Sequence, residues 1–159
     1  MQVLWAPWRM AYIGGPQAAG CIFCDARDST ERRARLVLRQ APAVVVFNRF
    51  PYTSGHLMVA PREHCGDLAA LSPAGFQTLT AVLHDTIRLL GQALHPDGLN
   101  VGMNVGAAAG AGVKDHVHWH IVPRWHGDTN FMPMLADVRV LPEHLEATFD
   151  RLAPIFDAA

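Results

Sequence analysis

Residues 116–122, which read His-Val-His-Trp-His-Ile-Val, constrain the fold and function of this chain more than any other segment. Successive side chains of a β-strand point to opposite faces, so the three histidines would share one face and the apolar residues the other. Alternate residues lie about 6.6 Å apart, because a strand rises about 3.3 Å per residue. The segment therefore predicts a strand with one face in the core and a row of imidazoles on the other. Pro123 is expected to end it, because proline offers no N–H to a neighbouring strand.

Three interpretations of His116, His118 and His120 are open. A solvated polar face is the simplest, but three histidines in strict alternation are unexpected there, because histidine is not a strong strand former. Alternate histidines can instead supply nitrogen ligands to zinc and leave one position for water. They can also carry out phosphoryl chemistry, in which one imidazole attacks phosphorus and the others bind the charge around it. Spacing alone does not decide between the last two interpretations.

The pattern His-φ-His-φ-His-φ-φ, in which φ is an apolar residue, resembles the signature of the histidine triad superfamily of nucleotide hydrolases and transferases. Further segments carry the same resemblance, namely residues 4–9, 21–24, 48–52, 55–59 and 127–131. Together they cover nearly the whole chain and resemble the bacterial branch that includes diadenosine tetraphosphate phosphorylases. The resemblance implies a homodimer or a higher homo-oligomer.

The same resemblance implies two-step nucleotidyl transfer on a dinucleoside polyphosphate or another adenine nucleotide. His118 would attack the α-phosphorus, because covalent catalysis splits one difficult displacement into two easier ones. Its other ring nitrogen should be held by an acceptor, most simply a backbone carbonyl of the same strand. His120 should hydrogen-bond to a phosphate oxygen or to the bridging oxygen that leaves. Water as the final acceptor would give a hydrolase, and phosphate would give a phosphorylase.

Two rival functions come from other classes. One is a zinc-dependent phosphohydrolase that uses the triad itself as ligands. The other is a nucleotide-binding regulatory protein with little turnover.

The resemblance also implies that several residues outside the triad bind the nucleotide. Asn48 corresponds to the position that binds ribose hydroxyls, although an asparagine that leaves a strand also caps turns. His56 is expected to support the triad by hydrogen bonding. The other candidates are Asn104, Gly110, Ala111, Gly112 and Trp125.

Residues 106–112 form a loop of glycine and alanine just before the histidine segment. Small residues let backbone N–H groups approach a phosphate closely. Many members of the family carry a Gln and a Ser or Thr in this loop, where the present chain has Ala111 and Gly112. Phosphate would therefore be held mainly by backbone amides, Asn104 and the histidines.

Cys21 and Cys24 have the two-residue spacing that lets both thiolates reach one zinc ion. His64 is the best candidate for a third ligand, and His116 would complete a site that resembles one in several bacterial histidine triad proteins. A site with four protein ligands would be structural and would tie the N-terminal segment to the sheet. Free reduced thiols or a thiol redox pair are the alternatives, and Cys65 could compete as a ligand.

The composition favours one cytoplasmic domain, residues 1–159, with an N-terminal arm at 1–20 and a core at 21–159. Half of the residues are hydrophobic and 17% are charged, which excludes a disordered chain. Lys and Arg number 13 against 14 acidic residues, so no basic excess favours duplex nucleic acid. No apolar run reaches the roughly 20 residues that cross a bilayer. The N-terminus does not have the charged region followed by an apolar region that is typical of a secretion signal, so secretion is not expected. Three cysteines indicate a reducing compartment.

The arm carries Trp5, Trp8, Arg9 and Tyr12 before a glycine-rich break. It is expected to pack onto the body of the protein or onto a partner subunit. An aromatic wall near a base, with Arg9 near phosphate, is the alternative.

Hydrophobic periodicity predicts the regular elements of the core. Strands are expected at residues 43–47, 56–61 and 99–105, and residues 25–39 are expected to be helical or irregular. Ser72 and Pro73 are preferred helix-start residues and begin the clearest helix, and another helix is expected from Pro142 to about residue 156. These elements predict an α+β fold with about five antiparallel strands and the two helices on one face.

Overall fold

The computed structural model describes residues 20–128 and 143–159. The expectations for Trp5, Trp8, Arg9 and Tyr12, and for residues 129–131, lie outside this part of the chain. The described helices and strands are α2 (Ile22–Asp28), α3 (Arg32–Arg35), β1 (Val37–Arg39), β2 (Ala43–Phe47), β3 (Leu57–Pro61), α4 (Pro73–Leu94), β4 (Gly98–Met103), β5 (Trp119–Arg124) and α6 (Leu145–Asp157). None of the helices in the described ranges is both long and apolar enough to cross a membrane.

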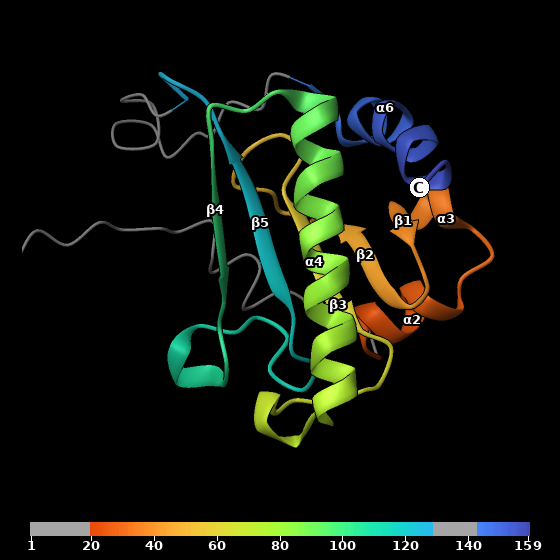
Figure 1. Cartoon of the computed structure of the whole chain (residues 1–159), viewed down its shortest axis with the longest axis vertical. Helices are drawn as coiled ribbons and strands as arrows, with labels where there is room; N and C mark the ends of the chain where they lie inside the picture. Colours follow the sequence, from red (N-terminus) through yellow and green to blue (C-terminus); the bar gives the residue numbers. More distant parts are fainter. Residues whose placement is uncertain (1–19, 129–142) are drawn as a thin grey trace, which may run out of the picture.

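The strands form one five-stranded antiparallel sheet in the order β1-β2-β3-β5-β4 (Figure 1). β4 pairs with β5 along its whole length, from Gly98 opposite Arg124 to Met103 opposite Trp119. β3 pairs with the first half of β5, and Met58 lies opposite His120. This sheet with its helices confirms the predicted α+β fold.

Helices cover both faces of the sheet. α4 runs across one face, and α6 packs beside it against β1 (Figure 1). Alternate strand residues on this face, such as Val45, Leu57 and Ile121, form the larger core with apolar residues of the two helices. On the opposite face, Phe23 of α2 packs in a second cluster with β2 and β3 residues such as Val44. The sequence predicted helices on one face only, because α2 is too short to show a helical period.

The clearest predicted helix begins as its sequence indicated. The Ser72 hydroxyl accepts a hydrogen bond from the Gly75 N–H at 3.0 Å, and Pro73 occupies the first turn. The helix ends at Leu94, and the next residue, His95, caps it with a left-handed backbone while its N–H donates to the Gly91 carbonyl. The C-terminal helix α6 begins at Leu145, later than the expected Pro142.

The histidine strand differs from its prediction at both ends. β5 begins at Trp119 because the Val117 N–H donates to the Cys65 carbonyl, beyond the end of β3, at 2.7 Å. It also continues past Pro123 to Arg124. The Pro123 carbonyl accepts from the Thr53 hydroxyl at 2.8 Å, on the side where β3 has not yet begun. The N–H and C=O groups of one strand residue point to the same side of the strand. The N–H that Pro123 lacks would therefore point away from β4, so no hydrogen bond between β5 and β4 is lost.

Candidate active site and metal cluster

A row of aromatic rings crosses the face of the sheet that carries the triad. Ring centroids lie 4.8 Å apart for Phe23 and His118, 4.8 Å for His118 and His120, 5.1 Å for His120 and His56, and 4.8 Å for His56 and Tyr52. His56 and His118 are buried, and His120 is half-buried. The register of the strands explains the row. His120 lies opposite Met58 of β3. His56 precedes Met58 by two residues, so its side chain points to the same face of the sheet.

The ring of His118 is held through its Nδ1 atom. Nδ1–H donates to the carbonyl of His116 at 2.9 Å, which confirms the expectation that a backbone carbonyl of this segment is the acceptor. Because a carbonyl only accepts, the proton of the neutral imidazole is on Nδ1 and the lone pair is on Nε2. Burial lowers the pKa of His118, and the bond to the carbonyl opposes this change only in part. The ring is therefore neutral and nucleophilic at physiological pH.

The protonation of His120 follows from a chain of hydrogen bonds that starts at the backbone. The Tyr52 N–H donates to Nδ1 of His56 at 3.1 Å, so the proton of a neutral His56 is on Nε2. This Nε2 lies 2.9 Å from Nδ1 of His120, which must therefore accept. The proton of His120 is consequently on Nε2, and this atom is a donor. Burial, with the neighbouring His118, lowers the pKa of His120 to about 4. His56 thus supports the triad as expected.

Asn48 and Asn104 flank the histidines at the ends of two strands. Asn48 caps a turn, because its Oδ1 accepts from the Phe50 N–H at 2.9 Å, and its Nδ2 lies 3.5 Å from Nδ1 of His56. The turn-cap interpretation of Asn48 is therefore confirmed, and its binding to ribose stays a prediction. Asn104 follows Met103, the partner of Trp119, and so lies level with His118 across the sheet.

The other predicted nucleotide residues lie at two separate places. Ala107–Ala109 form a 3-10 turn, and the amides of Gly110 and Ala111 donate to carbonyls of the same loop at 3.0 and 3.3 Å. The amides of Gly110 and Ala111 therefore already donate hydrogen bonds. Of the three predicted loop residues, only Gly112 has an amide without a hydrogen bond to a described residue. Trp125 follows β5 and lies about 16 Å along the strand direction from His120, at a rise of about 3.3 Å per residue.

Three residues that the sequence did not identify contribute to the site. Phe23 packs on both His116 and His118, and its position between the two cysteines is the signal that could have identified it. Tyr52 contributes its backbone N–H and its ring to His56. Gly102 lies opposite His120 in the β4–β5 ladder, and a Cβ atom added there would meet nothing within 4 Å. Among the described residues, the surface at Gly102 beside His120 is therefore open.

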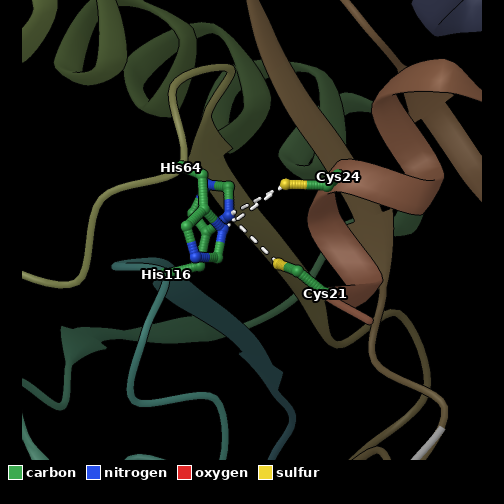
Figure 2. A group of neighbouring side chains, drawn as sticks. All are labelled: Cys21, Cys24, His64 and His116. Carbon is green, nitrogen blue, oxygen red and sulfur yellow. Dashed lines mark hydrogen bonds between the residues drawn. The ribbon is translucent and has the colours of Figure 1, made fainter. Parts of the chain in front are cut away.

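Cys21, Cys24, His64 and His116 form a cluster whose potential ligand atoms all lie within 4.8 Å of one another. Figure 2 shows the two sulfur atoms facing the imidazoles of His64 and His116. The Sγ atom of Cys21 lies 3.2 Å from Nδ1 of His116, and Sγ of Cys24 lies 3.4 Å from Nδ1 of His64. In a tetrahedral zinc site, sulfur and nitrogen ligands lie about 3.6 Å apart, because the bonds to zinc are about 2.3 and 2.0 Å long. The cluster therefore fits one metal ion with four ligands.

The protonation of His116 also favours a metal. Its Nε2 lies 2.9 Å from the carbonyl of Pro61, so Nε2–H donates and the lone pair of Nδ1 points to the thiols. Burial lowers the pKa of His116, which keeps the imidazole in the neutral form that metals bind. Burial also raises the pKa of the Cys24 thiol, followed by its contact with Cys21, and a cation would offset this effect.

Comparisons with known proteins agree with this geometry. A family model described as the HIT domain matches residues 29–127. The chain is 33% identical over 162 residues to the AP-4-A phosphorylase of Mycobacterium tuberculosis, an alignment that covers 96% of this chain and 83% of that protein. It is 31% identical over 112 residues to an uncharacterized HIT-like protein of Saccharolobus solfataricus, with 70% of this chain and 79% of that protein covered.

Solved structures have the same fold. The crystal structure of a zinc-bound histidine triad family protein from Mycobacterium smegmatis superposes with a TM-score of 0.68 at 28% identity, covering 87% of this chain and 94% of that one. A hypothetical histidine triad nucleotide-binding protein from Sulfolobus tokodaii superposes with a TM-score of 0.68 at 22% identity, over 87% and 93% of the two chains. Since the HIT domain model matches more than half of the chain and a relative is similar over nearly all of it, this protein belongs to the HIT family.

Proposed function

We propose that this protein transfers a nucleotidyl group from a dinucleoside polyphosphate, with diadenosine tetraphosphate as the model substrate, through a covalent bond to His118. The observation that carries the proposal is the fixed pair of ring nitrogens, a lone pair on Nε2 of His118 and a proton on Nε2 of His120. The similarity to a protein named AP-4-A phosphorylase supports the choice of substrate. His116, the third member of the triad, supplies the carbonyl that holds His118.

In the first step, Nε2 of His118 forms a bond to the α-phosphorus and the bond from phosphorus to the bridging oxygen breaks. The electron pair of that bond leaves with the nucleoside polyphosphate, which departs as an anion. His118 becomes a phosphorylated imidazolium, whose Nδ1–H remains bonded to the carbonyl of His116. Nε2–H of His120 donates to the leaving oxygen and stabilises its charge. One such donor typically contributes about 10² to 10³ in rate.

In the second step, an acceptor attacks phosphorus and His118 leaves as a neutral imidazole. Phosphate as acceptor gives a nucleoside diphosphate, and water gives a nucleoside monophosphate. The acceptor releases its proton to solvent. The name of the Mycobacterium tuberculosis relative favours phosphate.

The metal cluster has a structural role in this proposal. Zinc bound there would neutralise the two thiolates and join α2 to the sheet, and the zinc-bound relative from Mycobacterium smegmatis supports this choice of metal. The cluster contains one triad histidine and four protein ligands, so it leaves no position for a catalytic water among the described residues. A zinc hydrolase that uses the whole triad as ligands is therefore not favoured.

One observation favours the second candidate, a nucleotide-binding regulatory protein. The amides of Gly110 and Ala111 are bonded within their own loop, and this chain lacks the polar side chains that many members carry there. A regulatory protein would bind adenine nucleotides without consuming them.

The homodimer and the cytoplasmic location are predictions that the mass in solution and cell fractionation would test.

The deciding experiment is product analysis with diadenosine tetraphosphate in the presence and absence of phosphate. ADP and ATP formed only with phosphate identify a phosphorylase, and AMP and ATP formed in plain buffer identify a hydrolase. Intact-protein mass spectrometry after acid-free quenching should detect the added nucleotidyl group in the parent and in the His84→Ala control, whose side chain is 81% exposed on α4. The group should be absent from His118→Ala. Tight nucleotide binding without any product would instead identify the regulatory protein.

A further inference from the structure

Two of the four residues in the metal cluster are thiols that an oxidant can reach. Cys21 lies just before α2 and Cys24 lies in its first turn, and their Sγ atoms are within 4.8 Å of each other. Figure 2 shows both sulfur atoms on the side of α2 that faces the imidazoles. Both cysteines are half-buried, and His64, which lies 3.4 Å from Sγ of Cys24, is exposed. The pair is therefore accessible from solvent, most directly at Cys24.

The cluster can hold a metal only while both sulfur atoms are thiolates. The thiolate is the form that binds a metal, and it is also the form that attacks an oxidant. If the two sulfur atoms join in a disulfide, His64 and His116 are the ligands that remain in the cluster. A structural zinc site needs four ligands, so two imidazoles are not enough. Metal binding and oxidation of this pair therefore exclude each other.

The turn between the two cysteines connects the cluster to the nucleophile. Phe23 is fully buried, and its ring packs on His116 and His118 at centroid distances of 5.1 and 4.8 Å. Residues three apart on a helix have Cβ atoms about 5–6 Å apart, whereas a disulfide needs about 3.5–4.5 Å. The turn from Cys21 to Cys24 therefore has to contract when the disulfide forms. This contraction moves Phe23 relative to the ring of His118.

We propose that a peroxide oxidises Cys21 and Cys24 to a disulfide, that the metal then leaves the cluster, and that turnover at His118 falls. The Cys24 thiolate attacks one oxygen of hydrogen peroxide, the O–O bond breaks, and hydroxide leaves a sulfenic acid on Cys24. The Cys21 thiolate then attacks this sulfur, so that the S–S bond forms, the S–O bond breaks and a second hydroxide leaves. Two electrons pass from the sulfur atoms to the peroxide, and both hydroxides take protons from solvent. A small thiol reverses the oxidation by thiol–disulfide exchange.

The test treats the reduced, zinc-loaded full-length protein with hydrogen peroxide and afterwards with dithiothreitol and zinc. Peptide mapping without reduction should show a disulfide between Cys21 and Cys24, and a zinc-binding dye should detect metal released in proportion to it. Turnover of diadenosine tetraphosphate should fall by about 10²-fold, because a shift of about 1 Å at a catalytic group can cost this much. Dithiothreitol with zinc should restore the thiols, the metal and the turnover.

Cys65→Ser is the matched control, because Cys65 follows His64 in sequence but lies outside the cluster. This variant should respond to peroxide as the parent does. Absence of the disulfide, a disulfide that includes Cys65, metal retained by the oxidised protein or unchanged turnover would each overturn the inference.

The fall in turnover rests on the proposed function, whereas the disulfide and the metal release do not. A parent protein without turnover before oxidation would contradict the proposed function. The disulfide and the released metal would then still decide whether Cys21 and Cys24 are an oxidation site.

Discussion

His116 and His118 are two residues apart in one segment, yet the structure gives their rings opposite orientations. His116 donates Nε2–H to the Pro61 carbonyl and turns Nδ1 toward Cys21. His118 donates Nδ1–H to the His116 carbonyl and keeps Nε2 for other partners. The backbone carbonyl that each ring meets therefore decides which nitrogen is available. In the proposed function, the same residue type is therefore a metal ligand at one position and the nucleophile two residues later.

The metal cluster, here called the metal region, and the rings around His118 and His120, here called the nucleophilic region, are also in contact. The carbonyl that holds His118 belongs to His116, and Phe23 packs on both rings from between the two cysteines. A metal bound to the cluster would fix α2, and with it Phe23, against the triad. In the proposed function, the position of the His118 ring would therefore depend in part on the metal cluster.

Removing the nucleophile is the change with the largest expected effect on activity. His118→Ala should reduce turnover to the background rate while nucleotide affinity stays within about tenfold, because the lost group acts in the transition state. Steady-state kinetics and equilibrium binding measure the two quantities, and metal content should stay at the parent level. Equal losses of binding and turnover would mean that His118 only holds the substrate.

His56→Ala tests how the proton of His120 is positioned. Without His56, Nδ1 of His120 has lost its donor, so its proton is no longer confined to Nε2. A fall of about 10²-fold in kcat with a small change in KM is expected, as for the loss of one donor to the leaving oxygen. His56→Gln, which retains a donor, should recover part of the rate. A change confined to KM would contradict this role.

Much of the nucleophilic region could be predicted from the sequence. The alternation of residues 116–122 indicated which histidines share a face, and the acceptor for His118 followed from the chemistry of an imidazole. The choice between the two nitrogens of His116 and His120 could not be predicted, because it depends on Pro61 and Tyr52, which are distant from them in sequence. The contact of Phe23 with His118 could not be predicted for the same reason, because it joins α2 to the residue just before β5.

The fold was predictable where apolar periods are long and less so where they are short. Ser72, Pro73 and a long apolar stripe identified α4, and three consecutive valines identified β2. β1 was assigned to a helical or irregular segment because it has only three residues and lies among arginines. Pro123 misled the prediction because its effect on a strand depends on which neighbour its missing N–H would face.

The metal region should show its largest effect in stability. His64→Ala removes one of the four ligands, so the metal content of protein purified without added zinc should fall below one per chain. The midpoint of thermal unfolding should fall by about 10 °C, because metal binding contributes free energy to the folded state. Cys65→Ser is the matched control, since Cys65 is adjacent in sequence but lies outside the cluster. Loss of metal in Cys65→Ser, or a parent without stoichiometric metal, would contradict this assignment.

The smallest expected effect concerns the acid stability of the nucleophilic region. Burial and the nearby His118 hold the pKa of folded His120 at about 4, below its usual 6.5, so the unfolded chain binds this proton first as pH falls. His120 therefore contributes nothing to the pH dependence of stability above about pH 6.5 and destabilises the folded state between about pH 6.5 and 4. On going from neutral to acid pH in this range, the thermal midpoint of His120→Asn should fall by a few degrees less than that of the parent. His84→Asn, at an exposed site, should follow the parent. Both variants keep the metal cluster, so acid release of metal would lower all three midpoints together. An equal fall in all three would contradict this contribution of His120.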